Sequence, residues 1–383
     1  MEFKELFSEI DNLEAKYLRI WEELCNIESP TSDKAAVDEA GSYLIALAES
    51  LGYSVKLLEE VGAGNPFSIT VGESINAAPV VFSGHIDTVF PKGAFGYPPV
   101  TYDADTIHGP GVIDCKGGVV AAFYAAEALM RSGFDKRPIK IIIQTDEEMS
   151  SAPSEKRTVD FMISEAKDAA AFLNCEGLKQ GKLVLSRKGI MDFRFTVHGV
   201  EAHSSSSATL GASAIAEAAH KILEIEKMKD KDGVTASVNL INGGSTPNTV
   251  PGECSFVVDV RYATLAQKAE VERRFAELAA EASVEGTSTE LELYKGRPPM
   301  EYTERNKRLF DEINEVFISA GLPEMEADFS AGGSDAAYAT MAGIPCVDNF
   351  GVRGGYIHSV REYAFVASLK ESAKRLAAVA VGL

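Results

Sequence analysis

Pro79-Val-Val-Phe-Ser-Gly-His-Ile-Asp-Thr-Val89 is the stretch around which the rest of the chain is organised. Its short apolar run, Val80 to Phe82, predicts a strand, and His85 and Asp87 follow soon after. Residues i and i+2 of an extended backbone point to the same side, so these two side chains can act as a pair. One imidazole nitrogen would then be free for a metal ion while the carboxylate holds the other nitrogen. An isolated His-x-Asp is more often part of a polar loop, and the residues further along the chain decide between the two interpretations.

The length and composition are those of a soluble protein with more than one domain. The 383 residues are many for one core, so a second domain is expected. Hydrophobic residues make up 45% of the chain, and no apolar run approaches the roughly 20 residues of a membrane span. The formal net charge of -20 would repel nucleic acid and anionic lipid. Five widely spaced cysteines without a Cys-x-x-Cys pair, and an N-terminus unlike a signal peptide, favour a reduced, cytoplasmic location.

A glycine-rich loop, Gly109-Pro-Gly-Val-Ile-Asp-Cys-Lys-Gly-Gly118, precedes a predicted apolar helix over 119–130. Asp114 lies just before the start of that helix. Such loops can bind phosphate, but this one is neither a P-loop nor a dinucleotide fingerprint, and its acid would repel a phosphate. The loop therefore argues against a nucleotide-binding enzyme and leaves Asp114 as a candidate ligand.

Two further predicted strands end in acidic residues. The run 139–145 is the clearest buried strand, and Asp146-Glu147-Glu148 follows it. A second run, 169–174, is followed by Glu176. In open α/β sheets ligands bind at the carboxyl ends of the strands, so these acids are candidates for one site. Glu147 and Glu148 can share that site only if the chain turns after the strand; otherwise they mark a solvated strand end.

The pattern changes from Lys188 onward and indicates an inserted domain. Strands are predicted at 190–197, 234–240, 254–262 and 289–294, with helices at 210–228 and 265–282. The order β-α-β-β-α-β is that of the ferredoxin-like unit. We therefore predict an α/β catalytic domain of residues 1–187 and 298–383, with a mixed sheet flanked by helices, and an inserted α+β domain at 188–297. Further helices are expected at 2–27, 33–51, 306–320 and from Tyr363 to the end.

The strand-end and loop residues together form a set of two histidines, one aspartate and two or three glutamates. A dinuclear hydrolytic site needs about this set, with one carboxylate between two divalent ions and another left free as a base. Mixed nitrogen and oxygen ligands fit zinc, with cobalt or manganese as alternatives.

At this point the chain resembles the M20 metallopeptidase family, most closely its glutamate carboxypeptidase (carboxypeptidase G2-like) branch. The resemblance covers nearly the whole length, and its motifs occur in the family's order. They are Ser83-Gly-His-Ile-Asp-Thr88, the loop 109–118, Thr145-Asp-Glu-Glu148, Asn248-Thr-Val-Pro251, Asp259-Val-Arg261, Gly333-Ser-Asp335 and His358-Ser-Val-Arg-Glu362. The chain departs from the family's usual residues after Glu148, Glu176 and His203, in loops that border the substrate pocket.

The resemblance implies a zinc-peptidase-like fold and a role for each metal ligand. Asp114 would bridge two Zn²⁺ ions, with His85 and Glu176 on one ion and Glu148 and His358 on the other. Asp87 would orient His85. Glu147 would be the general base and then the proton donor to the leaving amine.

The resemblance also assigns substrate contacts. His203, in the inserted lid and dimerisation domain, would polarise the scissile carbonyl, from the partner subunit in dimeric members. Asn248, Arg261 and Gly333 would contact the substrate, with Arg261 on its terminal carboxylate. From its place in the second glycine-rich loop, we further hypothesise that Arg353 favours an acidic substrate side chain; a solvated loop arginine is the alternative.

These residues predict a hydrolase that releases a C-terminal amino acid from short peptides or N-acyl amino acids. The alternatives within the family are an N-acyl amino acid deacylase, such as acetylornithine deacetylase, and a dipeptidase or tripeptidase. A non-catalytic metal-binding scaffold is the alternative outside it, and the presence of Glu147 beside all five ligands argues against that. Cys115 and Cys175 adjoin proposed ligands but are expected to be small apolar residues.

Overall fold

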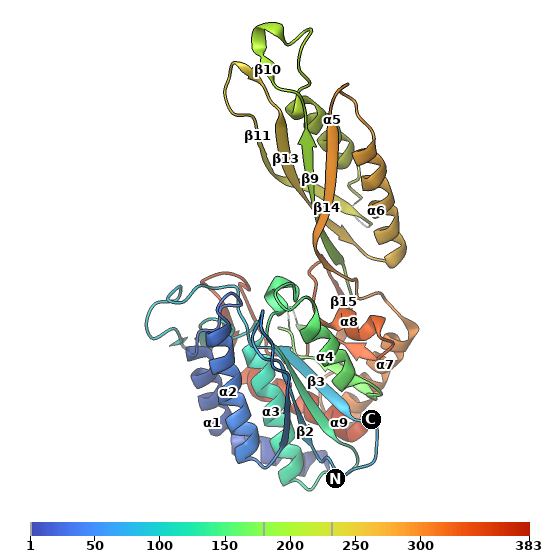
Figure 1. The fold of residues 1–383 in the computed structure, drawn as a ribbon. Helices are drawn as coiled ribbons and strands as arrows, with labels where there is room; N and C mark the ends of the chain where they lie inside the picture. Colours follow the sequence, from blue (N-terminus) through green and yellow to red (C-terminus); the bar gives the residue numbers. More distant parts are fainter. Residues whose placement is uncertain (1, 179–180, 231–232) are drawn as a thin grey trace. The chain divides into compact units, whose positions relative to one another are not determined.

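The computed structural model describes residues 2–178, 181–230 and 233–383, which fall into two compact units (Figure 1). The first unit is formed by residues 1–185, 302–329 and 334–383. The second unit is formed by residues 186–301 and 330–333. Within the described ranges, no helix combines the length and the apolarity that crossing a bilayer requires.

A six-stranded mixed sheet forms the centre of the first unit, in the order β1-β2-β6-β3-β7-β16. Its strands are β1 (Ser54–Leu57), β2 (Phe67–Val71), β3 (Val80–His85), β6 (Ile139–Gln144), β7 (Ala171–Asn174) and β16 (Cys346–Val347). Strands β6, β3, β7 and β16 are parallel, whereas β1 and β2 pair antiparallel. His85 lies opposite Gln144, and Ser83 lies opposite Asn174. The segments that follow β6, β3 and β7 therefore leave the sheet at one edge.

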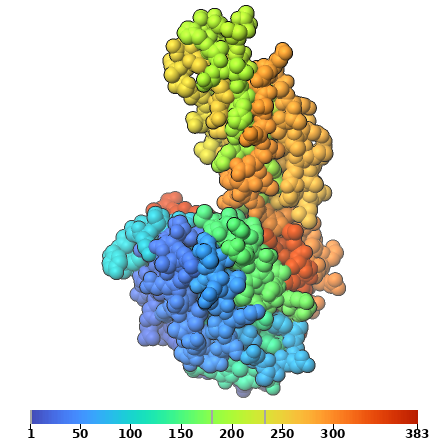
Figure 2. Space-filling view, in the orientation of Figure 1, coloured from blue at the N-terminus to red at the C-terminus, as the bar shows by residue number. Residues whose placement is uncertain are grey.

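Helices cover both faces of this sheet, so its central strands are buried along almost their whole length. One face packs in a single core with α1 (Phe3–Asn26), α2 (Lys34–Ser50), α3 (Lys116–Arg131) and α9 (Ala367–Gly382). On the other face lies α4 (Arg157–Ala166), whose Met162 sulfur contacts Ser83 and Gln144. The first two helices form an outer surface of the unit, in dark blue (Figure 2). Helices α7 (Glu304–Ser319) and α8 (Ala336–Met341) complete the unit.

A small second sheet holds the segment that contains His358. Its order is β17-β18-β5-β4, with β4 (Thr101–Asp103), β5 (Thr106–His108), β17 (Gly354–Gly355) and β18 (Tyr363–Phe365). His358 lies in the connection between β17 and β18. The expected start of the last helix at Tyr363 is wrong: this residue pairs with His108 in β18, and the helix begins at Ala367. Pairing with a distant strand outweighs the local helical pattern there.

The second unit has the β-α-β-β-α-β order that the sequence predicted. Its elements are β9 (Gly189–His198), α5 (Ala214–Glu226), β11 (Thr235–Gly243), β13 (Glu253–Tyr262), α6 (Leu265–Ala280) and β14 (Ser288–Arg297). The strands form an antiparallel sheet in the order β11-β13-β9-β14. Alternate residues of β9 and β13 are buried in an apolar core under the two helices, and the intervening residues form a polar face. Shorter strands of this unit are β10 (Ala202–His203) and β12 (Thr249–Val250), whereas β8 (Lys182–Arg187) and β15 (Glu326–Ser330), which pair with each other, lie mainly in the first unit.

Candidate metal centre

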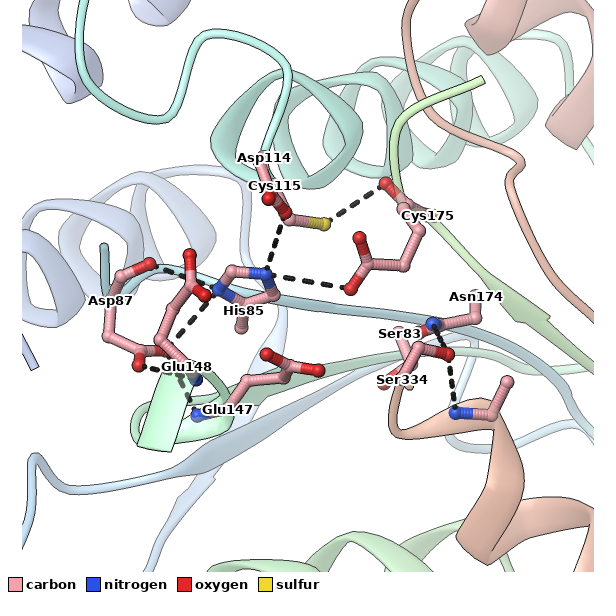
Figure 3. Close-up of polar contacts among 12 residues, drawn as sticks. Ser83, His85, Asp87, Asp114, Cys115, Glu147, Glu148, Asn174, Cys175 and Ser334 are labelled. Carbon is pink, nitrogen blue, oxygen red and sulfur yellow. Dashed lines mark hydrogen bonds and ion pairs between the residues drawn. The ribbon is translucent and has the colours of Figure 1, made fainter. Parts of the chain in front are cut away.

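The ends of three parallel strands deliver acidic and imidazole side chains to one place (Figure 3). His85 is the last residue of β3, and Glu176 follows β7. After β6 the chain forms a single 3-10 turn, Glu147–Met149. This is the turn that the sequence required if Glu147 and Glu148 were to face one site.

His85 is held between carboxylates on both of its ring nitrogens. Its Nδ1 lies 3.3 Å from Asp87 Oδ1 and 3.0 Å from the main-chain oxygen of Asp87. Its Nε2 lies 3.3 Å from Asp114 Oδ1 and 3.5 Å from Glu176 Oε1. The structure thus brings His85 and Asp87 together as their spacing indicated, and it directs the second nitrogen at two further acids (Figure 3).

Asp114 lies between two histidines that are far apart in the sequence. While its Oδ1 faces His85, its Oδ2 lies 3.2 Å from Nε2 of His358. The same Nε2 is 3.0 Å from Glu148 Oε2. Each oxygen of one buried carboxylate therefore faces a different histidine, and each histidine faces a further glutamate.

The electrostatics of the centre are those of a site that needs positive charge. Burial alone would lower the pKa of His85, but its hydrogen bonds to Asp114, Asp87 and Glu176 outweigh burial and raise that pKa. The Asp114 and Glu148 carboxylates raise the pKa of His358 to about 10. Burial, and then the charge of Asp114, raise the pKa of Glu148 and of Glu176. Buried carboxylates this close together are costly unless a cation lies among them.

The donor set fits divalent metal ions. His85, Asp114 and Glu148 place one ligand atom each within 4.8 Å of one another, and His85 does the same with Glu176 and Cys115. Imidazole nitrogen with carboxylate oxygen is the ligand chemistry that zinc accepts. Each of the two Asp114 oxygens faces a different histidine, so this carboxylate would offer one ligand atom on each side.

Residues 81–381 match the family model described as peptidase family M20/M25/M40. The chain belongs to this family. It is 27% identical over 376 residues to carboxypeptidase G2 from Pseudomonas sp. (strain RS-16), spanning 95% of this chain and 88% of that protein. It is 25% identical over 347 residues to succinyl-diaminopimelate desuccinylase from Nitrosospira multiformis, spanning 86% of this chain and 88% of that protein.

Solved structures agree with this assignment at the level of the fold. A tripeptidase from Staphylococcus aureus superposes with a TM-score of 0.79 at 23% identity, covering 96% of this chain and 97% of that one. An M20 family metallo-carboxypeptidase from Sulfolobus solfataricus has a TM-score of 0.74 at 16% identity, covering 96% and 98%. The M20 resemblance and the α/β fold class expected from the sequence are confirmed, and the chain is a hydrolase of amide bonds.

Asp87 also anchors the turn that carries the two glutamates of this M20 chain. Its Oδ1 accepts the backbone N–H of Glu147 at 3.3 Å, and its Oδ2 accepts that of Glu148 at 3.1 Å. The hydroxyl of Thr31 donates to Oδ2 at 2.8 Å. Sequence reasoning missed Thr31, although its place in the Ser29-Pro-Thr-Ser break after the first helix marks a loop rich in hydroxyl groups.

Glu362 is a second residue that sequence reasoning left without a role, although it ends one of the M20 motifs. Its Oε1 accepts the backbone N–H groups of Ile113 and Asp114, at 3.0 and 3.2 Å. The side chain is fully buried, and burial together with the charge of Asp114 raises its pKa to about 8. Glu362 therefore ties the segment after His358 to the loop that carries Asp114.

The neighbouring cysteines pack within the first unit of the M20 fold. The Cys115 thiol donates to the main-chain oxygen of Cys175 at 3.0 Å, and burial raises its pKa well above the ordinary value. A thiol that stays protonated is a poor metal ligand. The same carbonyl lies against α3: a Cβ on Gly118 would be 1.8 Å from the Cys175 oxygen, so only glycine allows the helix to start there.

The predicted substrate residues of the second unit lie in two places. Strand β10 pairs with β12, so His203 lies opposite Thr249, beside Asn248. His203 is exposed, and its Nδ1 is 2.8 Å from the hydroxyl of Ser205. Gly333 packs so closely that an added Cβ would lie 3.0 Å from Arg297 and Ile190 side-chain atoms.

Both predicted substrate arginines are already paired with acids. On β13, Arg261 forms two hydrogen bonds with Asp259. In the first unit, Arg353 forms two with Glu371, at 3.0 and 2.9 Å, and stacks over Phe365. Arg353 is thus paired with Glu371 while its side chain stays 38% exposed, and its effect on substrate choice stays a prediction.

Proposed function

We propose that this M20 hydrolase is a dinuclear metal enzyme that releases a C-terminal amino acid from short peptides or N-acyl amino acids. The amide bond that it cleaves lies next to a free carboxylate. The observation that carries the proposal is the position of Asp114, whose two oxygens face His85 and His358 separately. A single-ion site has no need for a carboxylate placed in this way.

The five ligands divide into two sets around that carboxylate. His85 and Glu176 would complete one site, and Glu148 and His358 the other, with Zn²⁺ as the expected ion and Co²⁺ or Mn²⁺ as alternatives. When bound, the ions supply Lewis acidity that makes a water nucleophilic near neutral pH. Asp87 would keep the His85 ring in place through the short contacts at Nδ1.

Glu147 is the proposed base. It is buried and adjoins the proposed ligand Glu148 in the same 3-10 turn. A carboxylate there would take the proton of the attacking water and return it to the leaving amine. For His203, Asn248, Arg261 and Gly333, the roles in holding the substrate and polarising its carbonyl rest on the motifs of the family. Arg353 remains a proposed contact for an acidic substrate side chain.

The proposed substrate class is taken from the names of similar proteins, and a second class is the alternative. Carboxypeptidase G2 spans nearly the whole chain and supports release of a C-terminal amino acid. Succinyl-diaminopimelate desuccinylases and an acetylornithine deacetylase from Myxococcus xanthus are also similar, so an N-acyl amino acid deacylase is the alternative. Tripeptidase activity has support only from the fold.

We also propose a cytoplasmic homodimer formed through the second unit. Strand β11 is an edge of its sheet and exposes Leu240 and Ile241, at 66% and 59%. An exposed apolar edge strand favours pairing with a second copy. All five cysteines are free thiols, as in a reducing compartment. Sedimentation at micromolar concentration tests the dimer, and a monomer there would contradict it.

The proposed function is tested by hydrolysis and metal content together. The zinc-reconstituted protein and its Glu147→Gln variant are assayed on N-acyl glutamates, N-acetylornithine, neutral dipeptides and a tripeptide. We expect one class to be cleaved, two ions per chain in both proteins, and a loss of about 10²–10⁴-fold in kcat for the variant. Equal cleavage by both proteins would refute the assignment of the base. One ion per chain in an active protein would refute the dinuclear site.

A further inference from the structure

Asp259 belongs to an M20 motif, yet the proposed function gives it no task. It lies on β13 two residues before Arg261, so both side chains project from the polar face of the sheet in the second unit. Asp259 Oδ1 accepts from Arg261 Nε at 2.8 Å, and Oδ2 accepts from Nη2 at 2.7 Å. The pair is about two-thirds buried, at 32% and 29% exposure.

The pair uses one particular edge of the guanidinium. Nε and the near N–H of Nη2 form its side edge, and this edge is filled by Asp259. The end edge consists of Nη1 and the outer N–H of Nη2. Among the described residues, no side chain or carbonyl accepts a hydrogen bond from Nη1 of Arg261. A planar guanidinium can bind one carboxylate at each edge, so the end edge has the geometry to receive a second one.

Further charges lie next to this pair in the same row of the sheet. Asp192 on β9 lies directly opposite Asp259, and Lys295 on β14 lies opposite Asp192. Burial, and then the charge of Asp259, raise the pKa of Asp192. This row places two acids beside Arg261, and among the described residues none of them is hydrogen-bonded to the end edge of its guanidinium.

We propose that Asp259 is a positioning residue that clamps Arg261 by its side edge and so presents the end edge to the terminal carboxylate of the substrate. This inference rests on the proposed function, because it takes that carboxylate as the feature that Arg261 recognises. A free arginine side chain samples many rotamers, and a bidentate partner removes that freedom before the substrate arrives. The opposite possibility is that Asp259 competes with the substrate and must be displaced.

The test compares two substrates that differ only at the recognised group. One is an N-acyl glutamate and the other is the same compound with its α-carboxylate converted to the carboxamide. Asp259→Asn is the variant, because one of its two acceptor atoms becomes an amide nitrogen that faces Nη2 or Nε and breaks the bidentate contact. Glu292→Gln is the matched control: Glu292 pairs with Arg194 at 3.1 Å on the same polar face and touches neither residue of the clamp.

For the carboxylate substrate we expect Asp259→Asn to raise KM about tenfold with kcat little changed. For the carboxamide we expect wild type, Asp259→Asn and Glu292→Gln to have the same KM and kcat.

A fall in KM for the carboxylate would show that Asp259 competes with the substrate. Equal losses of activity on both substrates would show a structural role. Either result overturns the clamp. If wild type cleaves neither compound nor any other member of the panel, the proposed function fails and the clamp fails with it. If wild type prefers the carboxylate and Asp259→Asn preserves that preference, the clamp alone fails.

Discussion

Glu362→Gln should make the metal-free protein more stable at pH 8 while leaving it almost unchanged near pH 4. In the folded chain the pKa of Glu362 is raised to about 8, first by burial and then by the charge of Asp114. In the unfolded chain a glutamate titrates near 4.3. The folded state therefore holds one more proton than the unfolded state between these values, so the wild-type free energy of unfolding falls as pH rises through that window. The Glu362 carboxyl stabilises the folded state in full below about pH 4, and this stabilisation is lost above about pH 8.

The size of the effect follows from the shift. About 1.4 kcal/mol per pKa unit gives a loss of about 5 kcal/mol for wild type by pH 8, as an upper value before the site relaxes. Glutamine does not titrate, and its oxygen can still accept the N–H groups of Ile113 and Asp114. Glu362→Ala is the control for those bonds: it does not titrate either, but it leaves two buried donors unpaired, so its free energy of unfolding should lie about 2 kcal/mol or more below that of Glu362→Gln at every pH.

Denaturant unfolding with a chelator present, at several pH values between 4 and 8, measures these differences. The difference in the free energy of unfolding between Glu362→Gln and wild type should widen steadily as pH rises. It should shrink when zinc is added, because bound cations would compensate the charge of Asp114. A gap that is constant with pH, or a glutamine variant as unstable as the alanine variant, would refute the argument that a buried proton resides on Glu362.

Three further outcomes follow from the geometry. Removing metal with a chelator should abolish hydrolysis and lower Tm, and Zn²⁺ should restore both; hydrolysis that survives complete metal removal would contradict the centre. Gly118→Ala should lower the free energy of unfolding by at least about 3 kcal/mol in chemical denaturation, because its Cβ would lie 1.8 Å from the Cys175 oxygen. Gly332→Ala is the control and should change this free energy little, because its Cβ would have no atom nearer than 3.8 Å. Lys116→Met should lower the free energy of unfolding by about 2–3 kcal/mol, because the fully buried Lys116 ammonium donates to the carbonyls of Leu24 and Ile27 at the end of α1. An unchanged denaturation midpoint would show that those carbonyls find other partners.

The arrangement of the centre could be predicted from the sequence where a ligand directly follows a strand. His85, Glu148 and Glu176 come after short apolar runs, and parallel strands bring such positions to one edge. The pairing of His85 with Asp87 needed only the period of an extended chain. The M20 motifs then added His358, which stands in a connection between two short strands and has no local pattern of its own.

Contacts between distant segments could not be predicted in this way. Tyr363 belongs to a strand because of β5, about 250 residues earlier, and no local propensity shows that. The salt bridge of Arg353 joins the second glycine-rich loop to Glu371 on the last helix, which a loop sequence rich in glycine does not indicate. Glu362 was visible as part of a motif, but tertiary packing decides which groups donate to it, namely the backbone N–H groups of Ile113 and Asp114 before α3.

The long sequence separation of the two loops that meet at the centre has a consequence for biosynthesis. Ile113 and Glu362, which join the two loops of the centre, are separated by 249 residues. At about 5–20 residues per second, a ribosome needs roughly 12–50 seconds to travel that distance, and the second unit emerges in between. A nascent chain that has passed Glu176 has the three strand ends but still lacks His358, one histidine of the centre. The proposed centre is therefore complete only after the ribosome has passed His358, and a copy that terminates before this residue lacks that ligand.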